Sequence, residues 1–345
     1  MGPYVSSAAR MMCDDRMKVP LVIAHRGVPG ERLEHTRPSY LLAIEQGADF
    51  IEPDVVSTSD RILVVRHENE IDGTTDVSDR PEFADRKATK VVDGVSHTGW
   101  FTEDFTLAEL KTLRCKERIP DLRPGNVALA GTEEILTLDE VLDIAEDAGG
   151  EAPVGVYIET KHPNYFEGLG ISLNDLLIET LERRGFNDPD ATVVIQSFES
   201  ANLRALRPRT PAILVQLMSV EGQPADFTVT GDSRTYDDLR SADGLAFVAE
   251  YADAIGPYKE LVVAPGVGPT GLVERAHNAG LDVHIWTMRN ENNFLPTNLR
   301  KGTVMADHGD ALSEYMAFFD AGVDGVFSDF TSTAVQARSQ WLQSH

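Results

Sequence analysis

The chain has 345 residues, of which 42% are hydrophobic and 25% are charged, and its formal net charge is −25. This composition is that of a globular protein and excludes a disordered or fibrous chain. The acidic excess repels phosphate backbones, which excludes nucleic acid and anionic membrane as main partners. No stretch of about 18 consecutive apolar residues occurs, so we expect no integral membrane segment.

The first residues and the cysteines give little support for export. Residues 1–18 interrupt their apolar positions with charges and show no secretory signal, so we expect a disordered leader. The chain as given is therefore expected in the cytoplasm, and a periplasmic or secreted location would require that a leader had been removed. Cys13 and Cys115 are too few for a disulfide framework. The oligomeric state is left open by these features.

Short β-branched runs alternate with helical patterns along the chain, which is typical of a parallel sheet with crossover helices. Eight core strands are predicted, at 21–24, 49–55, 154–160, 192–197, 211–217, 252–256, 282–287 and 323–328. Helices are predicted between most of them, at 37–47, 137–148, 171–185, 199–206, 239–250, 269–280 and 309–321. We therefore predict an α/β fold, a (β/α)8 TIM barrel, whose catalytic residues lie at the carboxyl ends of the strands. Several predicted helices end at a glycine, namely Gly47, Gly149, Gly185, Gly280 and Gly322.

One strand-like run, at 62–67, does not fit the alternation. It begins seven residues after Val55, and a parallel return needs a dozen or more residues. We therefore predict an antiparallel hairpin strand after the second barrel strand. With the turn near Asp60, residues whose numbers sum to about 119 face each other. This register places His67 opposite Glu52 and beside Asp54.

Residues 68–135 show little periodicity and many polar side chains. Their one clear helix start is at Thr106, where Thr106 and Glu109 can form a capping box. We interpret 68–135 as a cap insertion over the mouth of the barrel, within a single catalytic domain that spans 19–340. Residues 221–240 are predicted to form another long loop.

Three carboxylates are candidates for a metal site. Glu52 and Asp54 lie two residues apart on one strand and so share a face, as do Glu159 and Lys161 on the next. Three buried carboxylates on neighbouring strands cannot all stay ionised unless a cation lies among them. Oxygen ligands suit Mg²⁺ or Ca²⁺ rather than zinc. A lone Glu-x-Asp is more often a strand-end pair neutralised by Lys or Arg, but nearby histidines reverse that preference.

Two histidines are expected to flank the carboxylates. His25 ends the first strand, which adjoins the strand of Glu52, and His67 follows the hairpin strand. A lone strand-end histidine is more often structural, but two imidazoles beside a cation suit phosphoryl transfer. One would accept the proton of the attacking oxygen and the other would donate to the leaving alkoxide. Arg26 offers a bidentate fork for phosphate and Lys161 a point charge.

The remaining histidines are weaker candidates. We expect solvated or capping roles, in loops or on helix surfaces, for His35, His97, His162, His277, His308 and His345. His284 and Trp286 lie two residues apart on the seventh strand and could both face the barrel interior. A tryptophan there is either part of the core or a surface on which a small polyol stacks.

Four ordered motifs within 23–68 resemble those of a known family, namely HRG, EHT, GADFIEPD and LVVRHE. This segment resembles the opening of the glycerophosphodiester phosphodiesterases. The resemblance extends over about 23–335, and the long insertion resembles that of the large bacterial periplasmic-type branch. It continues through DFTLAELKTL (104–113), IETKHP (158–163), IQSF (195–198), AEYADAIGP (249–257), VHIWTMR (283–289) and GVFSDF (325–330).

The resemblance implies a barrel with an inserted cap and a role for each matching residue. His25 and His67 would be the general acid/base pair. One divalent cation, Ca²⁺ or Mg²⁺, would be held by three carboxylates. The implied metal ligands are Glu52, Asp54 and Glu159, and the implied substrate contacts are Arg26, Lys161, Trp286, Gln196 and Glu34.

The implied reaction is metal-dependent hydrolysis of a small glycerophosphodiester to sn-glycerol 3-phosphate and an alcohol. Glu68 and His35 depart from the family's usual Asp and Asn, at positions behind the catalytic groups. A related barrel phosphodiesterase that acts on lysophospholipids or teichoic-acid polymers is the alternative. A catalytically inactive polyol-binding or phosphate-binding barrel is disfavoured, because every matching site residue is present. The preferred alcohol, the choice of metal and the attacking oxygen, water or the glycerol 2-hydroxyl, stay open.

Overall fold

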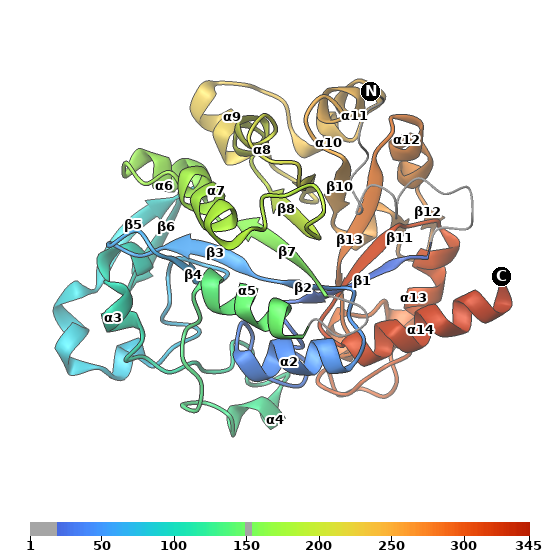
Figure 1. Ribbon diagram of the computed structural model, residues 1–345. Coiled ribbons are helices and arrows are strands. Elements are labelled where there is room, and N and C mark those ends of the chain that lie inside the picture. Colours follow the sequence, from blue (N-terminus) through green and yellow to red (C-terminus); the bar gives the residue numbers. More distant parts are fainter. Residues whose placement is uncertain (1–18, 149–153) are drawn as a thin grey trace.

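The computed structural model describes residues 19–148 and 154–345, and eight parallel strand positions form a closed barrel at its centre (Figure 1). The strands neighbour one another in the order β2, β1, β14, β13, β10, β9, β8 and β7, and β2 pairs with β7 to close the ring. The predicted (β/α)8 barrel is thus confirmed. Its strands are β1 (Leu21–His25), β2 (Phe50–Glu52), β3 (Asp54–Ser57), β7 (Gly155–Thr160), β8 (Val193–Ser197), β9 (Ile213–Met218), β10 (Ala254–Pro257), β13 (Asp282–Met288) and β14 (Gly325–Ser328).

The second barrel strand is divided at Pro53 into β2 and β3. Proline has no backbone N–H to donate, so it interrupts the ladder. Both halves pair with β7, with Phe50 opposite Gly155 and Asp54 opposite Glu159. Glu52, which ends β2, and Asp54, which begins β3, therefore both lie beside the same neighbouring strand, β7.

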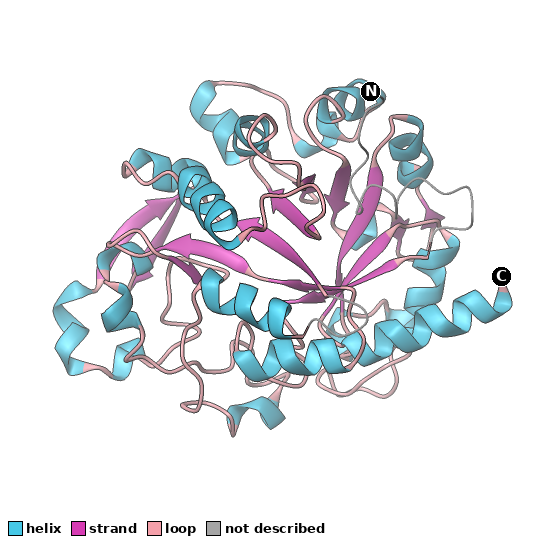
Figure 2. Ribbon diagram, viewed as in Figure 1, coloured by secondary structure: helices cyan, strands magenta, loops and turns pink. Residues whose placement is uncertain are grey.

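Helices cover the outside of the barrel (Figure 2). None of the described helices is long and apolar enough to cross a lipid bilayer. The helices after the insertion are α5 (Leu138–Asp147), α6 (Pro163–Gly168), α7 (Leu173–Arg184), α8 (Ser200–Leu206), α9 (Ala225–Thr230), α10 (Tyr236–Leu239), α11 (Ala242–Val248), α12 (Leu272–Asn278), α13 (Ala311–Asp320) and α14 (Thr331–Ser344), and α2 (Arg37–Glu45) follows β1.

The helix predictions need three corrections. The predicted loop at 221–240 contains α9 and α10. The helix predicted at 239–250 corresponds to α11, which begins only at Ala242, because the side chain of Ser241 accepts the N–H of Gly244 and caps the helix there. The C-terminal α14 was not predicted, because Ala334, Ala337 and Trp341 give it only a narrow buried stripe. The predicted leader at 1–18 and the helix end at Gly149 lie outside the described residues.

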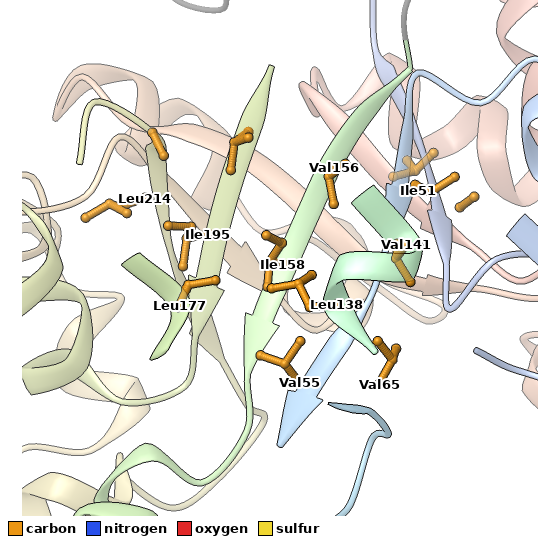
Figure 3. Packing of buried hydrophobic residues seen from close by; sticks show 14 of the residues in the cluster. Ile51, Val55, Val65, Leu138, Val141, Val156, Ile158, Leu177, Ile195 and Leu214 are labelled. Carbon is orange, nitrogen blue, oxygen red and sulfur yellow. The ribbon is translucent and has the colours of Figure 1, made fainter. Parts of the chain in front are cut away.

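The alternation of side chains along each strand separates two buried layers. On β7, Val156 and Ile158 belong to the buried cluster that also contains Leu138 of α5 and Leu177 of α7, and Figure 3 shows Ile158 next to Leu138. Burying each of these aliphatic side chains contributes about 1.5–3 kcal/mol. Tyr157, one position out of phase, belongs to a smaller cluster inside the barrel. Glu159 shares the inward face of Tyr157, so the same alternation that builds the core aims the carboxylate into the barrel.

The predicted insertion, residues 68–135, lies between the hairpin strand β4 (Leu63–Val65) and α5. β4 runs antiparallel to β3 with Val55 opposite Val65, so facing residues sum to 120, one more than predicted. The capping box of Thr106 and Glu109 is confirmed, at the start of α3 (Leu107–Leu110). The segment also holds α4 (Pro124–Val127) and an unpredicted hairpin of β5 (Ala88–Val92) and β6 (Val95–Gly99).

Candidate active site

Three carboxylates meet where β2, β3 and β7 end. Oxygens of Glu52, Asp54 and Glu159 all lie within 4.8 Å of one another, and all three residues are buried. Burial, with repulsion from Asp54 and Glu159, raises the pKa of Glu52 well above its usual range. Burial also raises the pKa of Glu159 to about 7. Without a cation, this cluster therefore retains a proton at neutral pH.

Asp54 keeps its negative charge in spite of its burial. Burial opposes ionisation, but His67 in its protonated form, Lys161 and the hydrogen bond from His35 outweigh burial and hold the pKa of Asp54 well below its usual range. Its Oδ1 is buried and has no hydrogen-bond partner among the described residues. Leaving a buried carboxylate oxygen without a partner costs free energy. Coordination of a cation by this oxygen would remove that cost.

His35 is fully buried, so the expected solvated or capping role is wrong. Its Nε2 lies 2.9 Å from Asp54 Oδ2, and its Nδ1 lies 2.7 Å from the hydroxyl of Tyr40. The backbone at His35 has a φ of 55°, and its N–H donates to the carbonyl of Arg26. This local turn carries the imidazole inward, where it orients Asp54. The other five histidines are exposed or half-buried, but the expected placement is wrong for His97, which lies on strand β6 rather than in a loop or on a helix.

His25 is oriented by a carboxylate that the sequence analysis missed. Asp329 follows β14, the neighbour of β1, and its Oδ1 lies 2.6 Å from His25 Nδ1. Burial opposes the ionisation of Asp329, but Arg289 and Arg123 hold its pKa well below its usual range. Asp329 is therefore ionised and His25 Nδ1 carries the proton, which leaves Nε2 as an acceptor. Burial, then Arg26, lowers the pKa of His25 to about 4.

His67 lies between an ammonium group and a carboxylate. Lys161 Nζ donates to Glu159 Oε1 at 2.6 Å and lies 3.2 Å from His67 Nε2, while His67 Nδ1 pairs with Glu68. Burial among the surrounding protein atoms, then the charges of Arg26 and Lys161, lowers the pKa of His67 to about 3. The ring is neutral, although part of it stays accessible. His67 therefore lies at the same end of the barrel as the carboxylates, where the predicted hairpin placed it.

The turn after β1 places the Arg26 guanidinium beside the carboxylates. Arg26 and Gly27 both have positive φ, 55° and 90°, and a Cβ at Gly27 would lie 2.3 Å from Ser39 Oγ. Only glycine fits there. The backbone N–H of Arg26 donates to Glu52 Oε2 at 2.8 Å, and its Nε lies 3.3 Å from Asp54 Oδ2.

Gln196 and Glu34, two other residues predicted to contact the substrate, form hydrogen bonds with neighbouring side chains of the site. Gln196 Nε2 donates to Glu52 Oε1 at 3.1 Å. Both carboxylate oxygens of Glu34 accept from Arg118, at 2.6 and 2.7 Å, and one lies 3.4 Å from Arg26 Nη1. Glu34 thus braces Arg26 and is not among the described residues that line the cavity below.

All the predicted site residues except Asp54 and Glu34 line one cavity of about 340 Å³. Its polar side is formed by His25, Arg26, Glu52, His67, Glu159, Lys161 and Gln196, and its apolar side by Phe198, Leu217, Tyr258, Trp286 and Phe327. The indole of Trp286 donates to the carbonyl of Gly256 and packs edge-on against Tyr258 and Phe198. His284 lies deeper in the barrel, where its Nδ1 meets the hydroxyl of Tyr157 at 2.9 Å.

Several supporting residues were missed from the sequence. Asp329 lies within the quoted GVFSDF segment, and its position just after a barrel strand is a signal that could have found it. Arg123, at the start of α4, is buried between Asp329 and Glu291, with its Nε 2.7 Å from Glu291 Oε1. Arg123 had no local signal, because its partners lie more than 150 positions away.

A (β/α)8 barrel with three clustered carboxylates, two histidines and two cationic side chains at one mouth defines a barrel phosphoric diester hydrolase. A sequence model of the glycerophosphoryl diester phosphodiesterase family matches residues 25–333. The chain belongs to this family, as the resemblance implied.

Relatives match over most of their length. Glycerophosphodiester phosphodiesterase GDPD6 of Arabidopsis thaliana is 37% identical over 91% of this chain and 84% of its own length. The Haemophilus influenzae glycerophosphodiester phosphodiesterase is 27% identical over 96% of this chain and 93% of its own length. A solved phosphodiesterase of Oleispira antarctica, in complex with its product sn-glycerol-3-phosphate, has a TM-score of 0.58 at 21% identity and covers 93% of this chain and 97% of its own. This last likeness supports the fold.

Proposed function

We propose that this chain hydrolyses glycerophosphodiesters to sn-glycerol 3-phosphate and a free alcohol, with one divalent cation, Ca²⁺ or Mg²⁺. One observation carries the proposal: His25 and His67 line the same cavity as two of three clustered, buried carboxylates. Family membership supports the reaction class. The cavity of about 340 Å³ suits a small-molecule substrate.

The three carboxylates fit a hard divalent cation. They offer only oxygen ligands, and Asp54 Oδ1 is buried without a partner. Burial, then repulsion from Asp54 and Glu159, raises the pKa of Glu52, and the charge of a bound cation would oppose this rise. When bound, the cation would supply positive charge to stabilise the phosphoryl oxygens as negative charge develops on them.

His25 is suited to accept the proton of the attacking oxygen. Asp329 holds the proton on Nδ1, so the lone pair of Nε2 is available. The carboxylate also stabilises the imidazolium that forms when Nε2 takes that proton. The attacking group is water or the glycerol 2-hydroxyl.

His67 would then donate a proton to the leaving alkoxide. Arg26 and Lys161 depress the pKa of His67 in the free protein. An anionic phosphodiester bound by Arg26 and Lys161 offsets their charges, which raises the pKa of His67 toward that of a proton donor. Trp286 would pack on the glycerol arm, while Gln196 and Glu34 hold Glu52 and Arg26 in place.

The proposal is tested by assaying release of glycerol 3-phosphate from a panel of glycerophosphodiesters, with Ca²⁺, Mg²⁺ or chelator in parallel. We expect turnover that chelator abolishes and one of the two cations restores. An absence of turnover on every diester would refute the reaction. Full activity in chelator would refute the metal site and leave the reaction standing.

A further inference from the structure

A second cavity, of about 290 Å³, adjoins the candidate active site. Loops after β7, β8 and β9 surround it at the same mouth of the barrel, and Asp93 at the tip of the β5–β6 hairpin lines it from the insertion. Glu159, Lys161 and Phe198 line both cavities. A phosphodiester with its phosphate beside Lys161 can therefore extend one arm into each cavity.

Phe198 separates the two cavities. Its ring packs edge-on against Trp286 of the first cavity, with centroids 5.7 Å apart, and against Tyr236 of the second, at 6.2 Å. The two sides of this partition differ in character. The first cavity has an apolar wall suited to the glycerol carbons, whereas the second combines aromatic rings with acidic side chains.

The basic side chains of the second cavity already have carboxylate partners. Lys161 Nζ donates to Glu159 Oε1 at 2.6 Å, and His162 Nδ1 lies 2.5 Å from Asp93 Oδ2. Glu199, in contrast, is 3% exposed and has no cationic partner among the described residues. Its carboxylate accepts only the backbone N–H of Asn164, at 3.1 and 3.3 Å.

The Glu199 carboxyl is therefore a buried acid without a counter-ion. Burial, then the charge of Asp93, raises the pKa of Glu199 to about 9. A cation close to this carboxyl favours its ionised form. The aromatic ring of Tyr236 also attracts a cation through its negative face, whereas Lys161 Nζ already lies over the Phe198 ring, 5.7 Å from its centroid.

We propose that the second cavity binds the leaving alcohol and selects alcohols that carry a cationic nitrogen, with Glu199 as the selecting residue. This inference rests on the proposed function and goes beyond it by naming the class of head group. The aromatic partition keeps the glycerol arm and the cationic head group on opposite sides of the phosphate.

The test compares two diesters that differ in charge alone. One is sn-glycero-3-phosphocholine, and the other is its 3,3-dimethylbutyl analogue, in which carbon replaces the quaternary nitrogen. Both diesters release glycerol 3-phosphate, so the same assay measures the turnover of each. We expect kcat/KM to be roughly tenfold higher for the choline diester, mainly through KM, from one ion–carboxylate contact and cation–π attraction.

The Glu199→Gln variant keeps the shape and the acceptor for Asn164, and we expect it to bring the ratio of the two kcat/KM values close to one. Glu167→Gln is the matched control, because Glu167 is an exposed acid on α6 outside the second cavity. It should keep the ratio. A ratio near one in the unchanged protein, or a ratio that Glu199→Gln leaves intact, would overturn the inference.

The two proposals fail in different ways. Equal turnover of both diesters overturns the head-group selection alone, whereas no turnover of either refutes the function and this inference with it. If the Glu199→Gln variant does not fold, a product-inhibition assay of the unchanged protein replaces the comparison with that variant. Free choline should then inhibit at concentrations about tenfold below those of 3,3-dimethylbutanol, and equal inhibition would contradict the inference.

Discussion

Replacing Arg123 by methionine should destabilise the protein through a stranded buried charge. The side chain is 6% exposed and pairs with Glu291 and Asp329. Asp329 retains Arg289, whose Nε lies 2.7 Å from Asp329 Oδ2. Glu291 loses its one ion-pair partner among the described residues, and its Oε2 already has no hydrogen bond. The cost of the substitution therefore falls on Glu291.

The magnitude follows from the buried charge left on Glu291. Removing one partner of a buried ion pair costs about 3–5 kcal/mol, because the remaining charge is left without compensation. We therefore expect Arg123→Met to lower the free energy of unfolding by about 3–5 kcal/mol.

Urea denaturation followed by circular dichroism measures this change, with the m-value checked for constancy. The double variant Arg123→Met/Glu291→Gln removes the stranded charge and should recover at least half of the loss. Arg183→Met is the matched control, since Arg183 is 54% exposed and pairs with Asp139 at 2.9 Å. It should cost under about 1 kcal/mol. A loss for Arg123→Met no larger than for Arg183→Met, or no recovery in the double variant, would refute this reasoning.

Three further predictions concern the catalytic histidines, the cation and acid stability. His25→Ala and His67→Ala should each lower kcat by roughly 10²-fold or more, and near-normal turnover in either variant would remove that residue from the acid/base pair. Adding Ca²⁺ or Mg²⁺ to metal-free protein at about 100 times its Kd should stabilise the fold by about 2.7 kcal/mol, measured as a rise in Tm, and Glu52→Gln should reduce that rise. Hydrogen bonds from Arg86 and the Thr106 N–H lower the pKa of Glu109 to about 2. Because this folded-state pKa lies below the unfolded value of about 4.3, Glu109 stabilises the fold above pH 4.3 and loses that effect as the pH falls toward 2. The urea midpoint of Glu109→Gln should therefore fall less between pH 6 and pH 3 than that of the unchanged protein, and equal falls would contradict the assignment.

Local patterns were enough to predict the barrel and the approximate site. Strand alternation is a local property, so Glu159 and Lys161 could be assigned to one face before any contact was known. The short interval between Val55 and the next strand forced an antiparallel return, which brought His67 toward Glu52 and Asp54. The register was one residue off, because the turn lies slightly further along than the spacing suggested.

The surroundings of these groups depended on contacts between distant segments. His35 looked like a loop histidine, and only the packing of its turn against Tyr40 and Asp54 shows that it is buried. Arg123 and Glu291 are equally plausible at the surface, and they become buried partners only when α4 lies against the barrel.

The sequence alone therefore predicts most of the residues that lie at the barrel mouth, because their positions at strand ends follow from short-range periodicity. The tertiary structure establishes how those residues are charged and held, and it reveals the second cavity beside Glu199. Charge state and cavity shape depend on neighbours hundreds of positions apart, and no local pattern records them. The three carboxylates illustrate the difference: strand spacing predicts that Glu52, Asp54 and Glu159 meet, whereas the fold shows that all three are buried and that burial and repulsion raise the pKa of Glu52.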